Sequence, residues 1–450
     1  MPHRNASEGE LAVNGGPKAI QAFEAQKGHW GLKVGIDEFM ALADLWGYSP
    51  EAQQKVRAIL IQEENQVNPQ LARYYTPHPS RAAQFEAYAR EVFGVKYALG
   101  VNSGTSALIA AYVACGVGPG SEVIVPAYTF YASAAAVVAA KGIPVIAEVD
   151  DSLTLDPADV ERKITPQTKA IVAVHMVGVS ADMDAIMAIA RRHNLVVIED
   201  NAQSCGGKYK GRYLGTIGDM GCFSLSTYKC VGAGEAGLVL TNDEWLYTRA
   251  QSQHDTAACW RPDRFAQERR PGELFCGENY RMSELEGALN LVQLQKMEAL
   301  ARQYNTNMRR IVAGLDAFPR TRLRRSNDLE GDLGYDVILL AENKEAAGKI
   351  AAALKAEGLP AGARGTRGSR DWHIYSFWEQ ILEHKTATPE GCPFTCPYHK
   401  GPLPPYSPDM CARSADLFDR AIHISVNQFW TERDCDQVAA AINKVCRAYG

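Results

Sequence analysis

The sequence predicts an α/β protein whose central sheet is mostly parallel. Between residues 97 and 241, seven short apolar runs rich in Val and Ile alternate with stretches of helical pattern. Runs with little polar alternation are typical of strands buried on both faces, and strand–helix alternation indicates parallel strands with helices on both sides. The runs are YALGV (97–101), EVIVP (122–126), IPVIAEV (143–149), KAIVAV (169–174), LVVIED (195–200), GCFSLS (221–226) and GLVLT (237–241).

Helical patterns fill stretches between these runs, at residues 105–116, 131–142 and 182–194. A longer pattern begins at Ser283, a candidate N-cap, and continues to about Asp316 with apolar residues at three- and four-residue steps. A helix of that length extends roughly 50 Å at 1.5 Å per residue. We expect it to connect two domains.

We divide the chain into three parts. Residues 1–60 are an N-terminal extension with an apolar helical pattern around Phe39, residues 61–316 are the large domain, and residues 317–450 are a smaller α+β domain. Residues 362–412 are rich in Gly, Pro, Arg and aromatic residues, so we expect an ordered functional loop there rather than a linker. The predicted elements of the smaller domain are a strand at 334–340, a helix at 344–357 and a final helix opened by the capping pair Thr431 and Asp434.

The composition excludes several classes of protein. Lys and Arg total 47 against 52 Asp and Glu, a net charge of −5, which argues against a nucleic-acid binder. No apolar stretch approaches the roughly 20 residues that cross a bilayer, and the polar start lacks the apolar core of a signal peptide. The eleven cysteines are scattered and never spaced as CxxC, which indicates reduced thiols. We expect a soluble, cytoplasmic protein with no nucleic-acid or membrane partner.

One cysteine pair lies close to a histidine in the sequence. Cys392 and Cys396, in CPFTC, are followed by His399. A structural zinc site needs a second ligand pair at suitable spacing, and we find none in the sequence. We therefore expect no metal, and ordinary thiols in a loop.

Two polar turns follow predicted strands. Asn102–Ser106 is a small polar turn between a strand and a helix, where backbone N–H groups and hydroxyls form a natural phosphate cradle. The same residues also suit a simple helix N-cap. Asp200 ends the fifth run, and ligands of open α/β sheets bind outside the carboxyl ends of strands. An acidic residue there is also a common loop starter.

A lysine and an aromatic residue follow two other strands. Lys229 precedes a Gly-rich turn, where partial desolvation would favour the neutral amine that Schiff-base chemistry requires, although most lysines are solvated surface charges. Phe130 follows the second run and suits either the core or stacking on a flat ring. A phosphate cradle, an aromatic plate, an acid and a lysine are together the parts of a pyridoxal 5′-phosphate (PLP) site.

The order and spacing of these motifs resemble the sugar aminotransferases of the DegT/DnrJ/EryC1/StrS family, from about Phe85 to Leu289. The resemblance implies the aspartate aminotransferase fold (PLP fold type I), with a mixed, mostly parallel seven-stranded sheet and a smaller α+β C-terminal domain. Within the family, the pattern is most similar to 8-amino-3,8-dideoxyoctulosonate aminotransferase. The matching segments are SGTSAL, PAYTFYAS, HMVGVSADMDAI, IEDNAQSCGGKYKGRYLGTIGDMGCFS, STYK, GEAG and ENYRMSELEGAL, with looser matches at WHIYSFW and HISVNQFW.

Carried over residue by residue, the resemblance implies roles for the matching positions. Lys229 would bond to the cofactor and move the proton between the substrate Cα and the cofactor, while Asp200 would pair with the pyridine nitrogen. The other implied contacts are Phe130 on the ring, Gln203 near the 3-hydroxyl, Gly104, Thr105 and Ser224 on the phosphate, and Asn279 on the phosphate of the neighbouring subunit's site. A homodimer with shared active sites is therefore implied.

The substrate side is less defined. Arg73 and Tyr74 occupy the stretch that lies over the site in relatives, where Arg73 would bind a carboxylate or phosphate. A surface arginine beside core tyrosines fits the same pattern. His373 and His423 are further candidates for substrate contact.

Two positions compare directly with the family pattern. The usual GEGG is GEAG here, and the added methyl of Ala236 is tolerated at ordinary φ but strained at positive φ. Position 229 is Lys, whereas relatives with His there catalyse dehydration, so transamination is favoured.

The sequence thus predicts a PLP-dependent aminotransferase that moves an amino group from glutamate or glutamine to a keto or aldehyde sugar, a sugar acid or a cyclitol. One alternative is a PLP enzyme of the same fold that catalyses an elimination or a carbon–carbon bond step in secondary metabolism. Another is a non-catalytic regulatory protein that retains the fold.

Overall fold

The computed structural model describes residues 7–20, 34–63, 71, 79–256 and 267–449. The chain separates into two compact units, residues 1–78 and residues 79–450, and each is described by itself. Among the described residues of the first unit, a single apolar side chain, that of Met40, is buried. Its elements are η1 (Glu8–Glu10), η2 (Ala12–Asn14), α1 (Ile36–Asp44), which contains the predicted helical pattern, and α2 (Pro50–Gln62).

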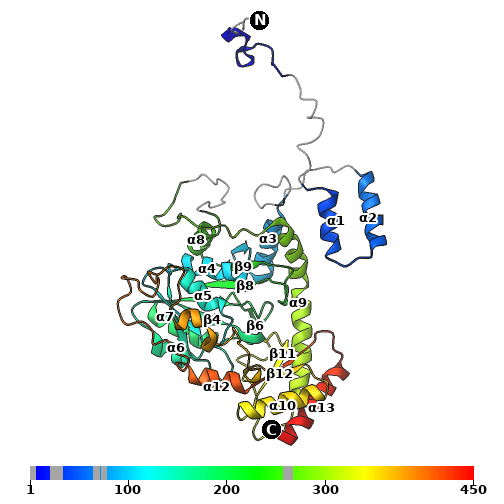
Figure 1. Ribbon diagram of the computed structural model, residues 1–450, viewed down its shortest axis with the longest axis vertical. Coiled ribbons are helices and arrows are strands. Elements are labelled where there is room, and N and C mark those ends of the chain that lie inside the picture. Colours follow the sequence, from blue (N-terminus) through cyan, green and yellow to red (C-terminus); the bar gives the residue numbers. More distant parts are fainter. Residues whose placement is uncertain (1–6, 21–33, 64–70, 72–78, 257–266, 450) are drawn as a thin grey trace. The chain divides into compact units, whose positions relative to one another are not determined.

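The second unit, drawn with its helices in Figure 1, contains a mixed, mostly parallel seven-stranded sheet. The strand order is β1-β9-β8-β5-β4-β2-β3. Strand β9 runs antiparallel to both neighbours, and the pairs from β8 to β3 are parallel. The fold class predicted from the apolar runs is therefore confirmed. The strands are β1 (Tyr97–Val101), β2 (Glu122–Pro126), β3 (Ile143–Ala147), β4 (Thr168–Val174), β5 (Val196–Asp200), β8 (Met220–Ser224) and β9 (Gly237–Thr241), with a hairpin of β6 (Lys208–Tyr209) and β7 (Arg212–Tyr213).

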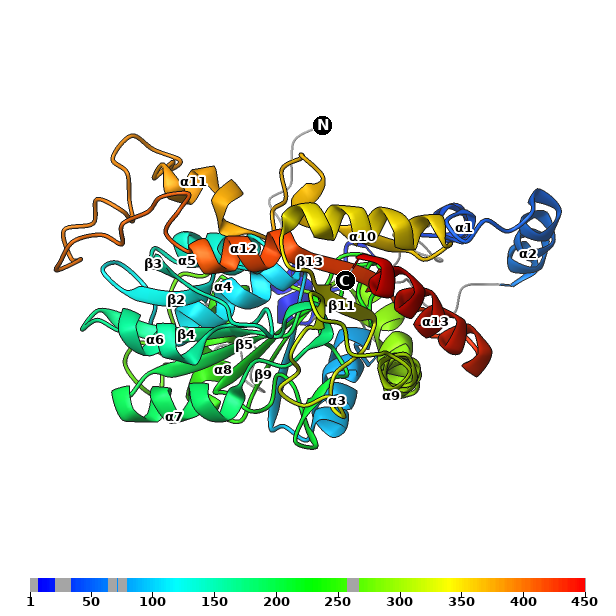
Figure 2. The same cartoon turned by 90° about the horizontal axis from the view of Figure 1, so that it is seen from below.

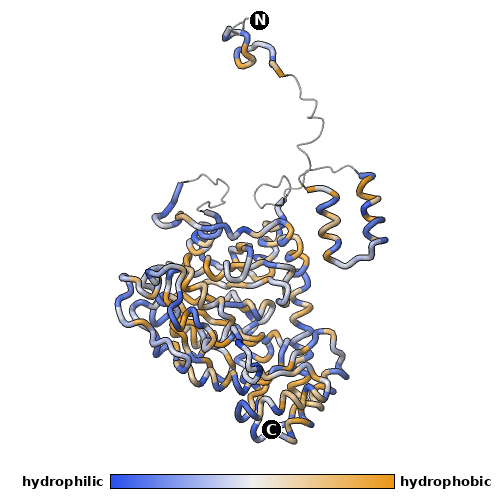
Figure 3. The backbone as a smooth tube through the Cα atoms, viewed as in Figure 1, coloured by the Kyte–Doolittle hydropathy of each residue, from blue (hydrophilic) through white to orange (hydrophobic). Residues whose placement is uncertain are grey.

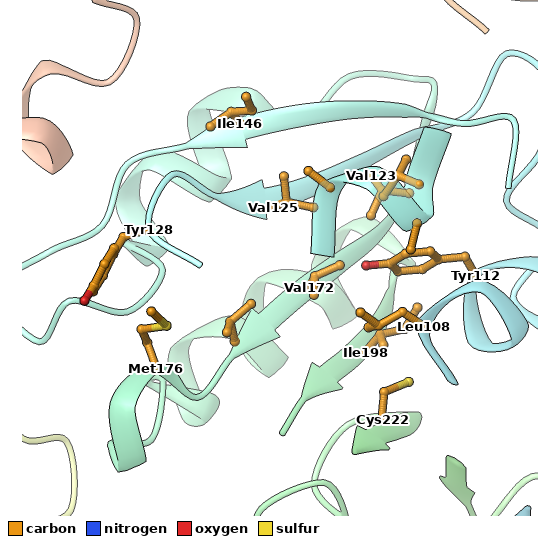
Figure 4. Close-up of a cluster of buried hydrophobic side chains, with 14 of the residues drawn as sticks. Leu108, Tyr112, Val123, Val125, Tyr128, Ile146, Val172, Met176, Ile198 and Cys222 are labelled. Carbon is orange, nitrogen blue, oxygen red and sulfur yellow. The ribbon is translucent and has the colours of Figure 1, made fainter. Parts of the chain in front are cut away.

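Helices cover both faces of this sheet. Alternate strand residues pack on opposite sides, so that Val123 and Val172 lie against Tyr112 of α4 (Figure 4), while Ile124 and Ile171 lie on the side of α6 and α7. Figure 2 shows α6 and α7 on the side opposite α4 and α5. Figure 3 shows hydrophobic segments in the interior of this unit and many hydrophilic segments at its edge. The helices are α3 (Arg81–Phe93), α4 (Gly104–Ala114), α5 (Ala132–Ala139), α6 (Pro157–Lys163), α7 (Met183–His193) and α8 (Glu244–His254).

The long helix predicted from Ser283 is α9 (Glu284–Ala313). Ser283 Oγ caps it by accepting a hydrogen bond from Glu286 N at 3.2 Å. The helix leads into an antiparallel sheet in the order β10-β11-β13-β12. The elements of this part are β10 (Arg322–Leu323), β11 (Asp336–Leu340), α10 (Lys344–Ala356), β12 (Ala361–Ala363), α12 (Ala412–Arg420), β13 (Ala421–Ser425) and α13 (Glu432–Tyr449).

The smaller part agrees with the predicted α+β pattern, with one shifted boundary. Strand β11 begins at Asp336 rather than at residue 334, because Gly334 has φ +81° and turns the chain. The predicted capping pair is present, since Thr431 N donates to Asp434 Oδ2 at 2.8 Å and Asp434 N to Thr431 Oγ1 at 3.3 Å. The boundary near residue 316 between a large and a small domain stays a prediction.

The segment 362–412 is fixed against the large sheet. Thr129 N donates to His373 O, and Tyr131 N donates to Trp372 O, both at 2.9 Å. Because these partners directly follow β2, the segment reaches the carboxyl edge of the sheet. It contains η5 (Arg364–Thr366), η6 (Tyr375–Phe377) and α11 (Glu379–Leu382). None of the described helices is both long and apolar enough to cross a membrane.

Candidate active site

Two adjoining cavities lie at the carboxyl edge of the seven-stranded sheet, where ligands of α/β proteins bind. The inner cavity has a volume of about 400 Å³ and is lined by residues that follow β1, β2, β5 and β8. The outer cavity has a volume of about 650 Å³ and is lined partly by residues of α9 and of the C-terminal part. Residues Ala202, Gln203, Lys229 and His373 line both cavities.

The start of α4 forms one wall of the inner cavity, with Ser103, Gly104 and Thr105. Ser103 Oγ caps the helix by accepting a hydrogen bond from Ser106 N at 3.0 Å. A Cβ on Gly104 would lie 2.6 Å from Ser224 Cβ, so a glycine is needed where the helix meets the end of β8. The turn is thus both an N-cap and an anion cradle, because the first N–H groups of a helix have no partner within it.

Asp200, at the end of β5, is 5% exposed and lines the inner cavity. Its Oδ2 accepts a hydrogen bond from Ser133 Oγ at 2.7 Å, and its Oδ1 accepts one from Ala202 N at 3.1 Å. Ser133 Oγ also lies 2.7 Å from Thr129 Oγ1. The sequence prediction missed Ser133. A serine in an otherwise apolar helix was the available signal, since buried hydroxyls require partners.

A buried pair lies beside Asp200. His175 Nε2 donates to Glu199 Oε2 at 2.9 Å, and Glu199 also accepts the backbone N–H groups of Gly215 at 2.8 Å and Gly218 at 2.6 Å. Burial raises the pKa of Glu199, but the bonds from His175 and these amides outweigh it and lower that pKa. An ionised carboxylate therefore anchors the turn that leads into β8.

Lys229 lies in the turn after β8. Its backbone N donates to Ser226 O at 2.9 Å. Burial lowers the pKa of the Lys229 amine, and the charge of Asp200 only partly opposes this. A lysine with a lowered pKa has more of the neutral amine, which is the form that attacks a carbonyl or accepts a proton.

The GEAG turn closes the same side of the inner cavity. Glu235 lines the cavity, and Gly234 has φ +122°. The described residues with positive φ do not include Ala236, which is fully buried. The methyl group of Ala236 is therefore accommodated at ordinary φ, the tolerated one of the two cases considered above.

Phe130 and His373 lie together at the junction of the cavities. Phe130 is 48% exposed, and its ring centroid lies 5.3 Å from that of His373. Asp371 Oδ1 lies 2.8 Å from His373 Nδ1, and Arg364 Nε donates to Asp371 Oδ2 at 2.7 Å. Burial lowers the pKa of His373 more than Asp371 raises it, which favours a neutral imidazole. The sequence prediction missed Arg364 and Asp371, because the segment 362–412 has no periodicity that distinguishes them.

Gln203 separates the two cavities. Its Oε1 accepts hydrogen bonds from Val177 N at 3.1 Å and from the hydroxyl of Tyr335 at 3.4 Å. These two donors orient the side-chain amide.

Two further predicted residues, His423 and Asn279, are described by the structure but line neither cavity. His423, on β13, has Nδ1 at 3.1 Å from Asp336 Oδ2 and lines neither cavity, although Asp336 lines the outer one. Asn279 also lines neither cavity. Arg73 and Tyr74 lie outside the described residues.

Most of the outer wall was not predicted. Apart from Lys229 and His373, its described polar side chains are hydroxyls, amides and one carboxylate, with the thiols of Cys205 and Cys230 beside them. Gln203 was predicted; the others come from segments far apart in the sequence, and motifs that contain some of them, such as STYK, gave them no role. The hydroxyl, amide and carboxylate residues are Gln203, Thr227, Tyr228, Gln293, Tyr304, Tyr335, Asp336, Ser425 and Gln428.

The inner cavity suits PLP. A helix N-terminus matches a phosphate, a buried carboxylate held by two donors matches a protonated pyridine nitrogen, and a desolvated lysine matches the aldehyde. The half-exposed face of Phe130 offers a surface for a flat ring. The predicted residues Gly104, Thr105, Phe130, Asp200, Gln203, Ser224 and Lys229 all line this cavity.

Comparison with known proteins agrees with this arrangement. The chain is 40% identical over 221 residues to GDP-perosamine synthase of Caulobacter vibrioides, covering 48% of this chain and 56% of that protein. It is 39% identical over 251 residues to L-glutamine:2-deoxy-scyllo-inosose aminotransferase of Micromonospora echinospora, covering 54% of this chain and 59% of that protein. The matches therefore span less than two thirds of these relatives.

A solved structure extends the likeness over most of the chain. The aminotransferase from Psychrobacter cryohalolentis superposes with a TM-score of 0.66 at 26% identity, covering 89% of this chain and 98% of that one. The family model of the DegT/DnrJ/EryC1/StrS aminotransferases matches residues 62–375. The chain belongs to the DegT/DnrJ/EryC1/StrS aminotransferase family.

Proposed function

We propose that the protein is a PLP-dependent aminotransferase that moves an amino group from glutamine or glutamate to a carbonyl of a sugar or cyclitol. The observation that carries this proposal is the placement of Lys229 in one cavity with Asp200 and the N-terminus of α4. Burial lowers the pKa of the Lys229 amine, as a nucleophile and proton carrier requires.

Each wall of the inner cavity has a part in holding the cofactor. Gly104 and Thr105 bind the phosphate with Ser224, while Asp200 keeps the pyridine nitrogen protonated and Phe130 covers the ring. When bound, the cofactor acts as an electron sink for negative charge on the substrate carbon. The Ser133 hydroxyl keeps Asp200 oriented, because Oδ2 is held at 2.7 Å.

Lys229 moves the proton in both halves of the reaction. As a neutral amine it accepts the proton from the amino-donor Cα, and it returns a proton to the acceptor carbon in the second half. His373 contacts the acceptor from the wall shared by both cavities. His423 acts through Asp336, whose side chain lines the outer cavity.

The relatives and the outer wall support the choice of substrates. The Micromonospora relative is named for L-glutamine and an inosose, a cyclic ketone with several hydroxyls. The hydroxyls and amides of the outer wall match the hydroxyls of such a ring. The eight-carbon sugar acid suggested by the sequence is a further acceptor of this class, although neither curated relative described above is named for it.

We also propose a homodimer with shared active sites. Asn279 lines neither cavity of its own chain, as expected if it reaches the phosphate of the neighbouring site. Light scattering gives the oligomeric state. Mixing the Lys229→Ala and Asn279→Ala variants should restore one intact site per mixed dimer, whereas no recovery would contradict sharing.

An absorption spectrum of the purified protein with PLP tests the function. We expect a visible band in the wild type that glutamine or glutamate converts to the absorbance of the pyridoxamine form, and no such band in Lys229→Ala. A band that neither amino acid changes would favour another reaction of the same fold. Absence of any band would favour a regulatory protein. We would then screen inososes, nucleotide-linked keto sugars and sugar acids as acceptors. The acceptor is the compound that becomes aminated only when the donor is present.

A further inference from the structure

The turn η4 (Met176–Gly178), after β4, contains a strained residue. Val177 has φ +50° and ψ +51°, in the left-handed region. A β-branched residue rarely adopts this conformation, because its Cβ substituents crowd the backbone. Such outliers persist only where surrounding contacts hold them, and they cluster at functional sites.

Arg324 holds this turn. Its Nη1 donates to Met176 O at 3.1 Å, and its Nη2 donates to Val177 O at 3.0 Å. One guanidinium thus fixes the two peptide groups on either side of the Val177 Cα. The residue is 6% exposed and follows β10, and its own backbone N donates to Ile338 O at 2.9 Å. The C-terminal part of the chain therefore supports a turn beside the inner cavity.

The turn sets the orientation of Gln203. Val177 N donates to Gln203 Oε1 at 3.1 Å, and the Tyr335 hydroxyl donates to the same oxygen at 3.4 Å. A carbonyl oxygen has two lone pairs, and these two donors occupy both. The Gln203 amide nitrogen, which is only a donor, is left to face a ligand, and Gln203 lines both cavities.

We propose that Arg324 is a positioning residue of the cofactor site. By holding Val177 at positive φ, it directs the Val177 N–H to Gln203 Oε1 and presents the Gln203 amide nitrogen to an anionic oxygen of the ligand. This rests on the proposed function, in which that oxygen is the ionised 3-hydroxyl of PLP. Arg324 itself touches neither substrate nor cofactor.

The inference predicts a spectroscopic effect. The Gln203 N–H donor stabilises the ionised oxygen of the bound cofactor. Losing this donor therefore raises the pH midpoint of the cofactor's absorption change. In Arg324→Met we expect a rise of about one pH unit and a PLP dissociation constant about tenfold higher. Arg324→Lys should fall between, because an ammonium holds fewer bonds in fixed geometry than a guanidinium fork. The control is Arg322→Met on the same segment, whose Nη1 pairs with Asp151 at 2.6 Å in an exposed site, and it should match the wild type.

A double variant separates positioning from general stability. Glycine adopts positive φ without a Cβ penalty, so in the Val177→Gly background the loss of Arg324 should change the PLP dissociation constant less than about threefold and the pH midpoint by less than about half a unit. An equal effect in both backgrounds would overturn the inference, as would an unchanged midpoint in both Arg324→Met and Arg324→Lys. If Arg324→Met does not fold, Arg324→Lys carries the same comparison. Failure of the proposed function is distinguishable, because the wild type itself would then show no cofactor band.

Discussion

The inner and outer cavities adjoin, but they are built differently. The inner cavity is lined by residues that directly follow successive strands, so short motifs such as SGTS and PAYTFYAS each supply one wall. The outer cavity collects side chains from α9, from β11 and from the stretch after β13. A site at the carboxyl edge of one sheet is encoded locally, whereas a site between distant segments is encoded only by the whole fold.

The same contrast extends to charge. The inner cavity has Asp200, Glu235 and Lys229 near the positive end of α4, which suits one cofactor with fixed charges. Outside the residues shared with it, the described outer wall carries one ionisable carboxylate, Asp336, among hydroxyls and amides. We infer that the inner cavity constrains the chemistry and the outer cavity the choice of acceptor, and four predictions test that division.

The largest effect should come from Lys229→Ala. It removes both the nucleophile and the proton carrier, so we expect turnover to fall by about 10⁴-fold or more. Lys210→Ala, an exposed lysine paired with Asp184, is the matched control and should keep wild-type turnover. Steady-state rates with glutamine and a keto acceptor measure both. If Lys229→Ala kept wild-type turnover, the inference that the inner cavity determines the chemistry would be wrong.

Asp200→Asn should lower turnover by about 10²- to 10³-fold, because the amide keeps the size but loses the charge that holds the pyridine nitrogen protonated. Ser133→Ala leaves the charge in place and removes one donor to it, so we expect about a tenfold loss. Both substitutions should act on the donor and acceptor halves alike. If turnover fell with one acceptor only, Asp200 would act on the choice of acceptor and not on the chemistry common to both halves of the reaction.

His373→Gln should raise the KM for the acceptor about tenfold with a smaller change in the donor half-reaction. It should also change the pH dependence of stability. Burial lowers the pKa of His373 below its ordinary 6.5, so between those two values the unfolded chain binds more protons than the folded one. Wild-type stability therefore rises with pH across that window and falls on acidification.

The His373→Gln variant has no proton to bind at that position, so it should lose this part of the slope. Urea unfolding at about pH 5 and about pH 7 measures the difference. An identical slope in the variant would contradict the assignment of a neutral imidazole.

The smallest effect should come from Ala236→Gly. Ala236 has ordinary φ, so glycine relieves no strain, and we expect turnover within about twofold of the wild type. Stability should fall by roughly 0.5–1 kcal/mol from the added freedom of the unfolded chain. Urea unfolding gives the second value, and a clear gain in turnover would mean that the methyl constrains the turn.

Much of the fold was predictable from local pattern. Apolar runs buried on both faces located the central strands, and Ser283 located the start of α9 to the residue. Residues that line the inner cavity were predictable because each follows a strand in a short motif, as Lys229 and Asp200 do.

The remainder depends on contacts between distant segments. Arg324 reaches the turn at Met176 across 148 residues of sequence, and no periodicity marks it. His423 stays a predicted substrate residue; it lines neither cavity, and its Nδ1 lies 3.1 Å from Asp336 Oδ2. The register of β13 against β11 decides which of their side chains reach the cavity. A single sequence contains no direct signal for such register.

The buried Glu199 carboxylate determines which segments of the site unfold together. Its carboxylate is fully buried and joins His175 at the end of β4 to the turn before β8. Opening any one of these pieces alone would remove part of the hydrogen bonding of a buried charge, which is costly in an interior without water. The ends of β4, β5 and β8 should therefore open together as one cooperative unit in hydrogen exchange, so that cofactor release and loss of this unit follow the same step on heating.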